Sequence, residues 1–84
     1  MAKLVVTMTD GNIHNVEITP RLEYNFEQHV GMGFHKAILE MQKQSDIYWL
    51  AFEGLRLGGV TVRPMPEFLD TLKSVDVVDS DPLA

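Results

Sequence analysis

The chain opens with two short segments in which apolar and polar side chains alternate. This period of two predicts half-buried β-strands over residues 3–9 and 13–18, because successive side chains of a strand point to opposite faces. Asp10-Gly11-Asn12 lies between the segments and is a turn signal, so we expect a β-hairpin. The apolar side of this hairpin is expected to carry Leu4, Val6, Met8, Val16 and Ile18.

The register of the hairpin can be chosen by asking which side chains each loop length brings together. A two-residue loop would place Val6 opposite Asn15 and would mix the two faces. A three-residue loop over residues 10–12 places Val6 opposite Val16 and keeps one face apolar. We therefore expect the three-residue loop, with Asn12 in the left-handed conformation that asparagine tolerates. The expected pairs are Leu4 with Ile18, Val6 with Val16, and Met8 with His14.

The segment after the hairpin has the pattern of a helix over residues 20–30. Thr19 suits the N-cap position, and Pro20 suits the first helical position. Apolar side chains then recur every four residues, which places them on one face. Gly31 follows the last of them and is a common helix stop. The apolar stripe consists of Leu22, Phe26 and Val30.

The middle of the chain predicts two more helices. A helical pattern runs over residues 34–41, after the glycines. A third helix is expected to begin at a cap formed by Ser45 or Asp46 and to end near Gly58-Gly59. The apolar positions of the first of these patterns are Phe34, Ile38, Leu39 and Met41.

The last third of the chain mixes extended and helical signals. Residues 60–62 indicate a short extended piece, and either Pro64 or Pro66 could start a last helix. The apolar positions of that helix would be Phe68, Leu69 and Leu72. Residues 75–84 are acidic and β-branched, so they either dock as an extended segment or remain mobile.

These elements predict one α+β domain. We expect an N-terminal β-hairpin followed by three or four short helices. The single domain over residues 1–84 divides into the hairpin at 3–18, a helical part at 20–74 and an acidic tail at 75–84.

The third helix has more apolar surface than one core contact needs. Residues 47–52 are six consecutive apolar residues that include the only tryptophan. Such a run covers every face of a helix, whereas a helix of a small domain needs only one apolar stripe. Most of these side chains are expected in the core, but at least one ring should stay partly exposed. Exposed aromatic residues are enriched in protein interfaces, so we expect a protein-binding surface here. The candidate binding residues are Tyr48, Trp49, Phe52 and Leu55.

Composition narrows the function further. The 84 residues have a net charge of −5, and no two lysines or arginines are adjacent. Nucleic-acid and membrane-surface binding are therefore not expected, because both use clustered positive charge. The sequence has no cysteine, no apolar run long enough to span a membrane and no signal-peptide pattern.

Candidate chemistry is sparse. His14, His29 and His35 do not have metal-ligand spacing, and Gly31-Met32-Gly33 lacks the third glycine of a dinucleotide-binding loop. The aspartates at 76, 79 and 81 do not match a calcium loop, and neither Ser45 nor Ser80 lies in a nucleophile motif. We expect no catalytic residue, cofactor or metal, and therefore no enzyme.

A resemblance gives this interpretation a biological setting. The residues that carry it are 18–21, leading into Phe26-Glu27, then 48–52, then 67–70 with the acidic positions that follow. In these segments the chain resembles the small tail assembly chaperones of long-tailed bacteriophages, especially those of phages that infect actinobacteria. It departs from many of them at Phe52, where they have a second tryptophan.

The resemblance implies a binding partner and a cellular location. Such chaperones coat the long helical tape measure protein in the cytoplasm of the infected host, help recruit tail tube subunits, and leave before the virion is complete. Self-association is also expected. The family often makes a longer form by ribosomal frameshifting. The alternative hypothesis is a small structural virion protein, a tail or connector subunit that self-associates and remains in the particle.

Overall fold

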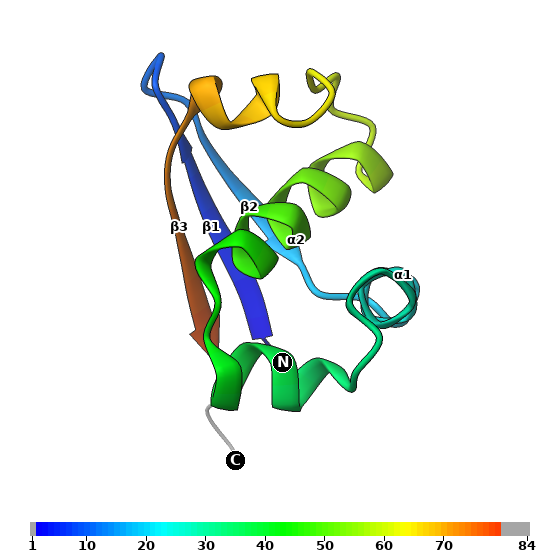
Figure 1. Cartoon of the computed structure of the whole chain (residues 1–84). Helices are drawn as coiled ribbons and strands as arrows, with labels where there is room; N and C mark the ends of the chain where they lie inside the picture. Colours follow the sequence, from blue (N-terminus) through cyan, green and yellow to red (C-terminus); the bar gives the residue numbers. More distant parts are fainter. Residues whose placement is uncertain (1, 80–84) are drawn as a thin grey trace.

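The computed structural model describes residues 2–79, apart from the side chains of Ala2, Leu39 and Asp79. Its elements, in chain order, are β1 (Ala2–Met8), β2 (Ile13–Glu17), α1 (Pro20–Val30), the π-helix η1 (Lys36–Met41), α2 (Gln44–Leu57), the 3₁₀-helix η2 (Glu67–Thr71) and β3 (Leu72–Asp79). The three strands form one antiparallel sheet in the order β2-β1-β3. The helices all lie on one face of this sheet (Figure 1), so the expected α+β class is confirmed.

The hairpin forms as expected, but its register differs from both alternatives. Val6 lies opposite His14, not Val16, and Leu4 lies opposite Val16. The amide of Met8 donates to the carbonyl of Asn12 over 2.9 Å, so the three-residue loop is Thr9-Asp10-Gly11. Gly11 takes the left-handed conformation, with φ of 94°, where glycine pays no steric penalty.

The loop also explains why Asn12 is not its left-handed residue. The amide of Asn12 donates to Oδ1 of Asp10 over 2.9 Å, which fixes the turn from the aspartate side. The shift moves the pairing by two residues, so the apolar face is unchanged and only the partners differ.

The C-terminal third contains the largest correction. We expected the helical part to reach residue 74 and an acidic tail to follow, but residues 72–79 form β3 and pair with β1. Val75 and Val77 lie opposite Val6 and Leu4, so they extend the core-facing side of the sheet. Of the two alternatives for the tail, the docked extended segment is correct as far as Asp79. Residues 80–84 lie outside the described part of the chain.

Helix α1 begins and ends where its sequence signals predict. Oγ1 of Thr19 accepts from the amide of Leu22 over 3.2 Å, and Pro20 is the first helical residue. Gly31 ends the helix in the left-handed conformation, with its amide bonded to the carbonyl of Glu27.

Helix α2 begins earlier than predicted. Its N-cap is Lys43, because the carbonyl of Lys43 accepts from the amides of Asp46 and Ile47. The expected caps at Ser45 and Asp46 therefore lie inside the helix, where the Asp46 carboxylate still favours the amino end electrostatically. The helix ends at Leu57, before Gly58-Gly59, as expected.

Neither of the two short helices is an α-helix: η1 is wider and η2 is tighter. The segment around 34–41 contains the π-helix η1, in which the amide of Gln42 bonds to the carbonyl of Ala37. The last helix is the 3₁₀-helix η2, which contributes Phe68 to the core. Leu69 is 39% exposed and Leu72 belongs to β3, so the expected apolar stripe of this helix is wrong in two of its three positions. No strand forms at residues 60–62, although Val60 and Val62 pack against the core.

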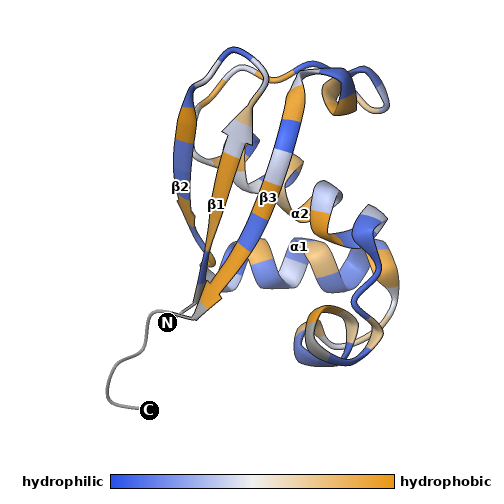
Figure 2. Ribbon diagram, turned by 90° about the vertical axis from the view of Figure 1, so that its left-hand side faces the viewer, coloured by the Kyte–Doolittle hydropathy of each residue, from blue (hydrophilic) through white to orange (hydrophobic). Residues whose placement is uncertain are grey.

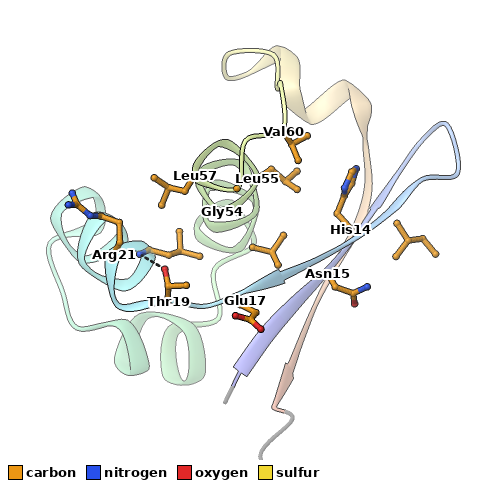
Figure 3. A pocket seen from close by; sticks show the side chains of 13 residues that line it. His14, Asn15, Glu17, Thr19, Arg21, Gly54, Leu55, Leu57 and Val60 are labelled. Carbon is orange, nitrogen blue, oxygen red and sulfur yellow. Dashed lines mark hydrogen bonds between the residues drawn. The ribbon is translucent and has the colours of Figure 1, made fainter.

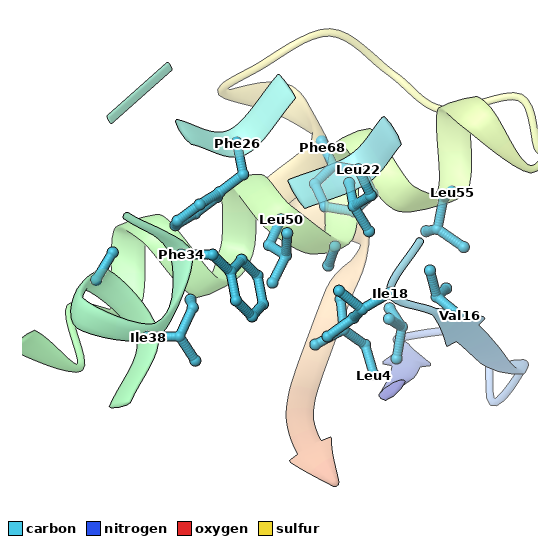
Figure 4. Close-up of a cluster of buried hydrophobic side chains, with 13 residues drawn as sticks. Leu4, Val16, Ile18, Leu22, Phe26, Phe34, Ile38, Leu50, Leu55 and Phe68 are labelled. Atoms are coloured by element: carbon cyan, nitrogen blue, oxygen red, sulfur yellow. The ribbon is translucent and has the colours of Figure 1, made fainter. Parts of the chain in front are cut away.

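The core lies between the sheet and the helices (Figure 4). The hairpin contributes the side chains that we expected, with Met8 only partly buried. At the far end, the rings of Phe26 and Phe34 meet edge to face with centroids 5.5 Å apart. The buried set consists of Leu4, Val6, Val16, Ile18, Leu22, Phe26, Phe34, Ala37, Ile38, Leu50, Ala51, Leu55 and Phe68.

No helix of residues 2–79 covers the opposite face of the sheet (Figure 2). Strand geometry places Val5, Ile13 and Asp76 on this face, among other side chains of mixed polarity. Ile13 is 61% exposed, the largest exposed fraction of any large apolar side chain in the described residues.

Candidate protein-interaction site

The outward side of α2 presents three aromatic rings. Tyr48, Trp49 and Phe52 are each partly exposed, and at 100° per residue they fall within an arc of about 100° of the helix. We call these three residues the aromatic surface. The buried side of the same helix carries Leu50 and Ala51, which face the core.

Two rings of the aromatic surface are held by neighbouring elements. Trp49 stacks on the imidazole of His29 in α1, with ring centroids 4.2 Å apart and planes 6° from parallel. The indole also lies 6.1 Å from the ring of Phe26. Phe52 meets Phe68 of η2 edge to face at 5.5 Å. Trp49 and Phe52 therefore pack against the core on one side and are partly exposed to solvent on the other.

Tyr48 differs from its two neighbours. No ring contact or hydrogen bond of its side chain is found among residues 2–79. Its side chain is therefore the member of the aromatic surface that is least tied to the fold.

Leu55 does not belong to this surface. It is 2% exposed and forms part of the core beneath α2. Its angle around α2 does not explain this, because at 100° per residue Leu55 lies only about 20° from Tyr48. Leu55 is buried because it lies two turns further along the helix, next to Gly54, where α2 comes close to Val16 of β2. In this fold, a partner that covers the aromatic surface does not reach the Leu55 side chain.

A polar cluster that the sequence analysis missed joins α1 to α2. Glu53 is 5% exposed, and its carboxylate accepts hydrogen bonds from both Arg56 and Asn25. The two bonds from Arg56 measure 2.8 and 2.7 Å, and the bond from Nδ2 of Asn25 measures 2.8 Å. The spacing of Glu53 and Arg56 is visible in the sequence, but the partner from α1 is not.

This cluster fixes the charge of Glu53. The hydrogen bonds from Arg56 hold the pKa of the Glu53 carboxyl below its ordinary value, although burial acts in the opposite direction. Arg56 is itself exposed, and its two hydrogen bonds to Glu53 orient the guanidinium one helical turn beyond Phe52. A fixed arginine beside aromatic rings is a common composition for a protein-binding site.

A groove lies on another side of the molecule, between β2 and the adjoining ends of α1 and α2 (Figure 3). Its volume is about 670 Å³. Val16, Leu22 and Leu55 supply apolar lining, while Glu17 and Arg21 are the charged residues that line it. The sequence analysis gave no signal for this groove, because it is formed by elements that meet only in the fold.

The described residues contain no arrangement that suggests a metal site or a membrane span. No three side chains of histidine, aspartate or glutamate in this part of the chain gather as a metal site would need. No helix within residues 2–79 has both the length and the apolar character to cross a bilayer. His29 is instead a stacking partner of Trp49, and His35 lies edge to face on Phe34 at 5.8 Å.

Comparison of the chain with protein-family models, curated proteins and solved structures gives no match.

Proposed function

We propose that this protein is a phage tail assembly chaperone that binds the tape measure protein through the aromatic surface and helps recruit tail tube subunits. The observation that carries the proposal is that Tyr48, Trp49 and Phe52 are all partly exposed on one side of α2. Large aromatic side chains that stay partly exposed on one side of a helix are typical of binding sites.

The chemistry of the partner fits this surface. A tape measure protein is largely helical, and an amphipathic helix binds through apolar anchors at i, i+3, i+4 and i+7. The outward side of α2 offers aromatic rings and the oriented guanidinium of Arg56 to such a helix. The net charge of −5 helps keep a chain with partly exposed rings in solution and favours a basic or neutral target segment. The resemblance of residues 18–21 and 48–52 to tail assembly chaperones supports the same partner.

The test uses two tyrosines. Tyr48→Ala removes the ring least tied to the fold, and Tyr24→Ala removes a tyrosine that is 58% exposed on α1. Each variant is checked by circular dichroism and then used to capture the tape measure protein of the same genome. We expect Tyr48→Ala to weaken capture about tenfold or more, as for a binding hot spot, and Tyr24→Ala to bind like the parent.

Two results decide the proposal. Equal capture by parent and folded Tyr48→Ala would contradict the assignment of the aromatic surface. Mass spectrometry of purified particles separates the chaperone from the structural alternative, because a chaperone is absent from virions and a tail or connector subunit is present in many copies.

A further inference from the structure

Strand β2 has a free edge within the described part of the chain. The sheet order β2-β1-β3 gives β2 a neighbour on one side only among residues 2–79. The bond from the amide of Met8 to the carbonyl of Asn12 sets the phase of the hairpin, so alternate residues of β2 bond to β1. The backbone groups of Ile13, Asn15 and Glu17 therefore point away from β1, where they offer donors and acceptors to a further strand.

The groove of about 670 Å³ lies beside this edge. Successive side chains of a strand added to β2 would alternate between the groove and the open face of the sheet. Those that enter the groove would meet Val16, Leu22 and Leu55, which are apolar. Those on the open face would lie next to Ile13, Asn15 and Glu17. Figure 3 shows Asn15 and Glu17 on the same side of β2. An exposed strand edge with an adjoining apolar groove is the geometry by which proteins bind extended peptides.

Charge indicates what occupies this edge. Glu17 is exposed, and within residues 2–79 no ion pair joins its carboxylate to Lys3, its cross-strand partner on β1. A strand with lysine or arginine opposite Glu17 would place a cation on the side of Glu17 that faces away from Lys3. A second copy of the chain would instead bring together two molecules that each carry a net charge of −5. Arg21, the cation that lines the groove, belongs to α1 and points to a different side of β2 from Glu17 (Figure 3).

We propose that the β2 edge binds an extended segment of a partner protein by strand addition. The segment is apolar where it enters the groove, and it carries a lysine or arginine opposite Glu17. This site is separate from the aromatic surface, and the proposal does not depend on the identity of the partner proposed above.

The probe is a pair of blocked seven-residue peptides in which valine alternates with threonine. One peptide has a single lysine on the threonine side, and the other has glutamate at that position. Binding is followed by amide NMR of the full chain, together with the hydrogen exchange of residues 13, 15 and 17. We expect the lysine peptide to slow exchange at these amides and to bind about two- to fivefold more tightly than the glutamate peptide, as for one exposed ion pair.

Two controls separate strand addition from other binding. N-methylation of alternate peptide nitrogens removes the donors of one edge, so methylation of the edge that faces β2 should abolish binding, and methylation of the other edge should not. Glu17→Lys should reverse the preference between the two peptides. Glu67→Lys, the same charge change at an exposed residue outside the groove, should leave the preference unchanged.

Three outcomes would overturn the proposal. The first is equal binding by peptides methylated on either edge. The second is the absence of any change at the β2 amides at millimolar peptide. The third is protection of the β2 amides that rises with the concentration of the protein alone, which would make a second copy the occupant. None of these results bears on capture of the tape measure protein by the aromatic surface, so the two proposals fail separately.

Discussion

Gly54 of α2 lies so close to Val16 of β2 that a Cβ atom placed on the glycine would be 2.6 Å from Cγ1 of the valine. The same Cβ would be 3.3 Å from Cδ2 of Leu22. The helix therefore approaches the sheet at a point where only glycine fits, and this contact sets the depth at which α2 sits.

Gly54→Ala should destabilise the fold. The added methyl group overpacks the contact, which typically costs about 1–3 kcal/mol, and this exceeds the gain of about 1 kcal/mol from better helix propensity. The matched control is Gly58→Ala, whose Cβ would come no closer than 3.4 Å to any atom outside its chain neighbours. Urea denaturation measures both variants. Equal stability of parent and Gly54→Ala would show that the helix can move away from Val16 at little cost.

Phe26→Ala should remove a large part of the stability of the domain. The ring of Phe26 is fully buried and lies against the rings of Phe34 and Trp49. Its truncation therefore leaves a cavity and costs about 3–5 kcal/mol. Domains of this size have about 5–15 kcal/mol in total. Tyr24→Ala on the same helix, at a largely exposed ring, should change stability by less than about 0.5 kcal/mol. Thermal denaturation of the two variants side by side tests this. A Phe26→Ala protein that melts with the parent would mean that the α1 stripe is not core.

The Glu53 cluster should make stability depend on pH. The pKa of Glu53 is lower in the folded state than its ordinary value of 4.5, because Arg56 donates to the carboxylate. The charged form is therefore favoured by folding, and its contribution is complete above pH 4.5 and is lost as the pH falls through the folded pKa.

Glu53→Gln tests this linkage. The variant should be about 1–3 kcal/mol less stable than the parent at pH 7, because Asn25 and Arg56 lose the charged acceptor that the buried Glu53 gives them. The difference should shrink below pH 4.5. Glu40→Gln, at an exposed residue, serves as the control. A parent and Glu53→Gln difference that stays constant from pH 7 to pH 3 would argue against the pKa shift.

His29→Ala should uncover one face of Trp49. The two rings are stacked at 4.2 Å, so removal of the imidazole admits water to the indole. Because Trp49 is the only tryptophan, its fluorescence reports this directly, and we expect emission at longer wavelength. The lost contact should cost about 0.5–1.5 kcal/mol. His35→Ala, which touches Phe34 but not Trp49, should leave the emission unchanged. Unshifted emission from a folded His29→Ala protein would mean that the stack does not shield the indole.

Local signals in the sequence predicted the first half of the fold well. The Thr19-Pro20 start and the Gly31 end of α1 follow from capping chemistry that acts within a few residues. The apolar face of the hairpin follows from alternation, whereas its register depended on which residue of the loop adopts positive φ. Asparagine and glycine both tolerate that conformation, and Gly11 adopts it.

The missed features all depend on contacts between distant segments. The sequence predicts the end of a helix at residues 72–74 and a tail from residue 75, because nothing near these residues shows that β1 has an unpaired edge. The buried environment of Glu53 requires Asn25 from another helix, and the groove requires α1, α2 and β2 together. The aromatic run predicted partly exposed rings from geometry alone, but the burial of Leu55 depended on the orientation of α2 against the sheet.

The strand order has a consequence for how the chain folds. The central strand β1 pairs with β3, so Ala2 has Asp79 as its partner across nearly the whole sequence. Pairs so distant in the sequence form slowly, because closing the long intervening loop costs entropy before the strands gain any hydrogen bonds. Until residues 72–79 have emerged from the ribosome, the backbone groups on one edge of β1 have no partner strand. During synthesis, this edge is where the nascent chain is most prone to pair with another chain.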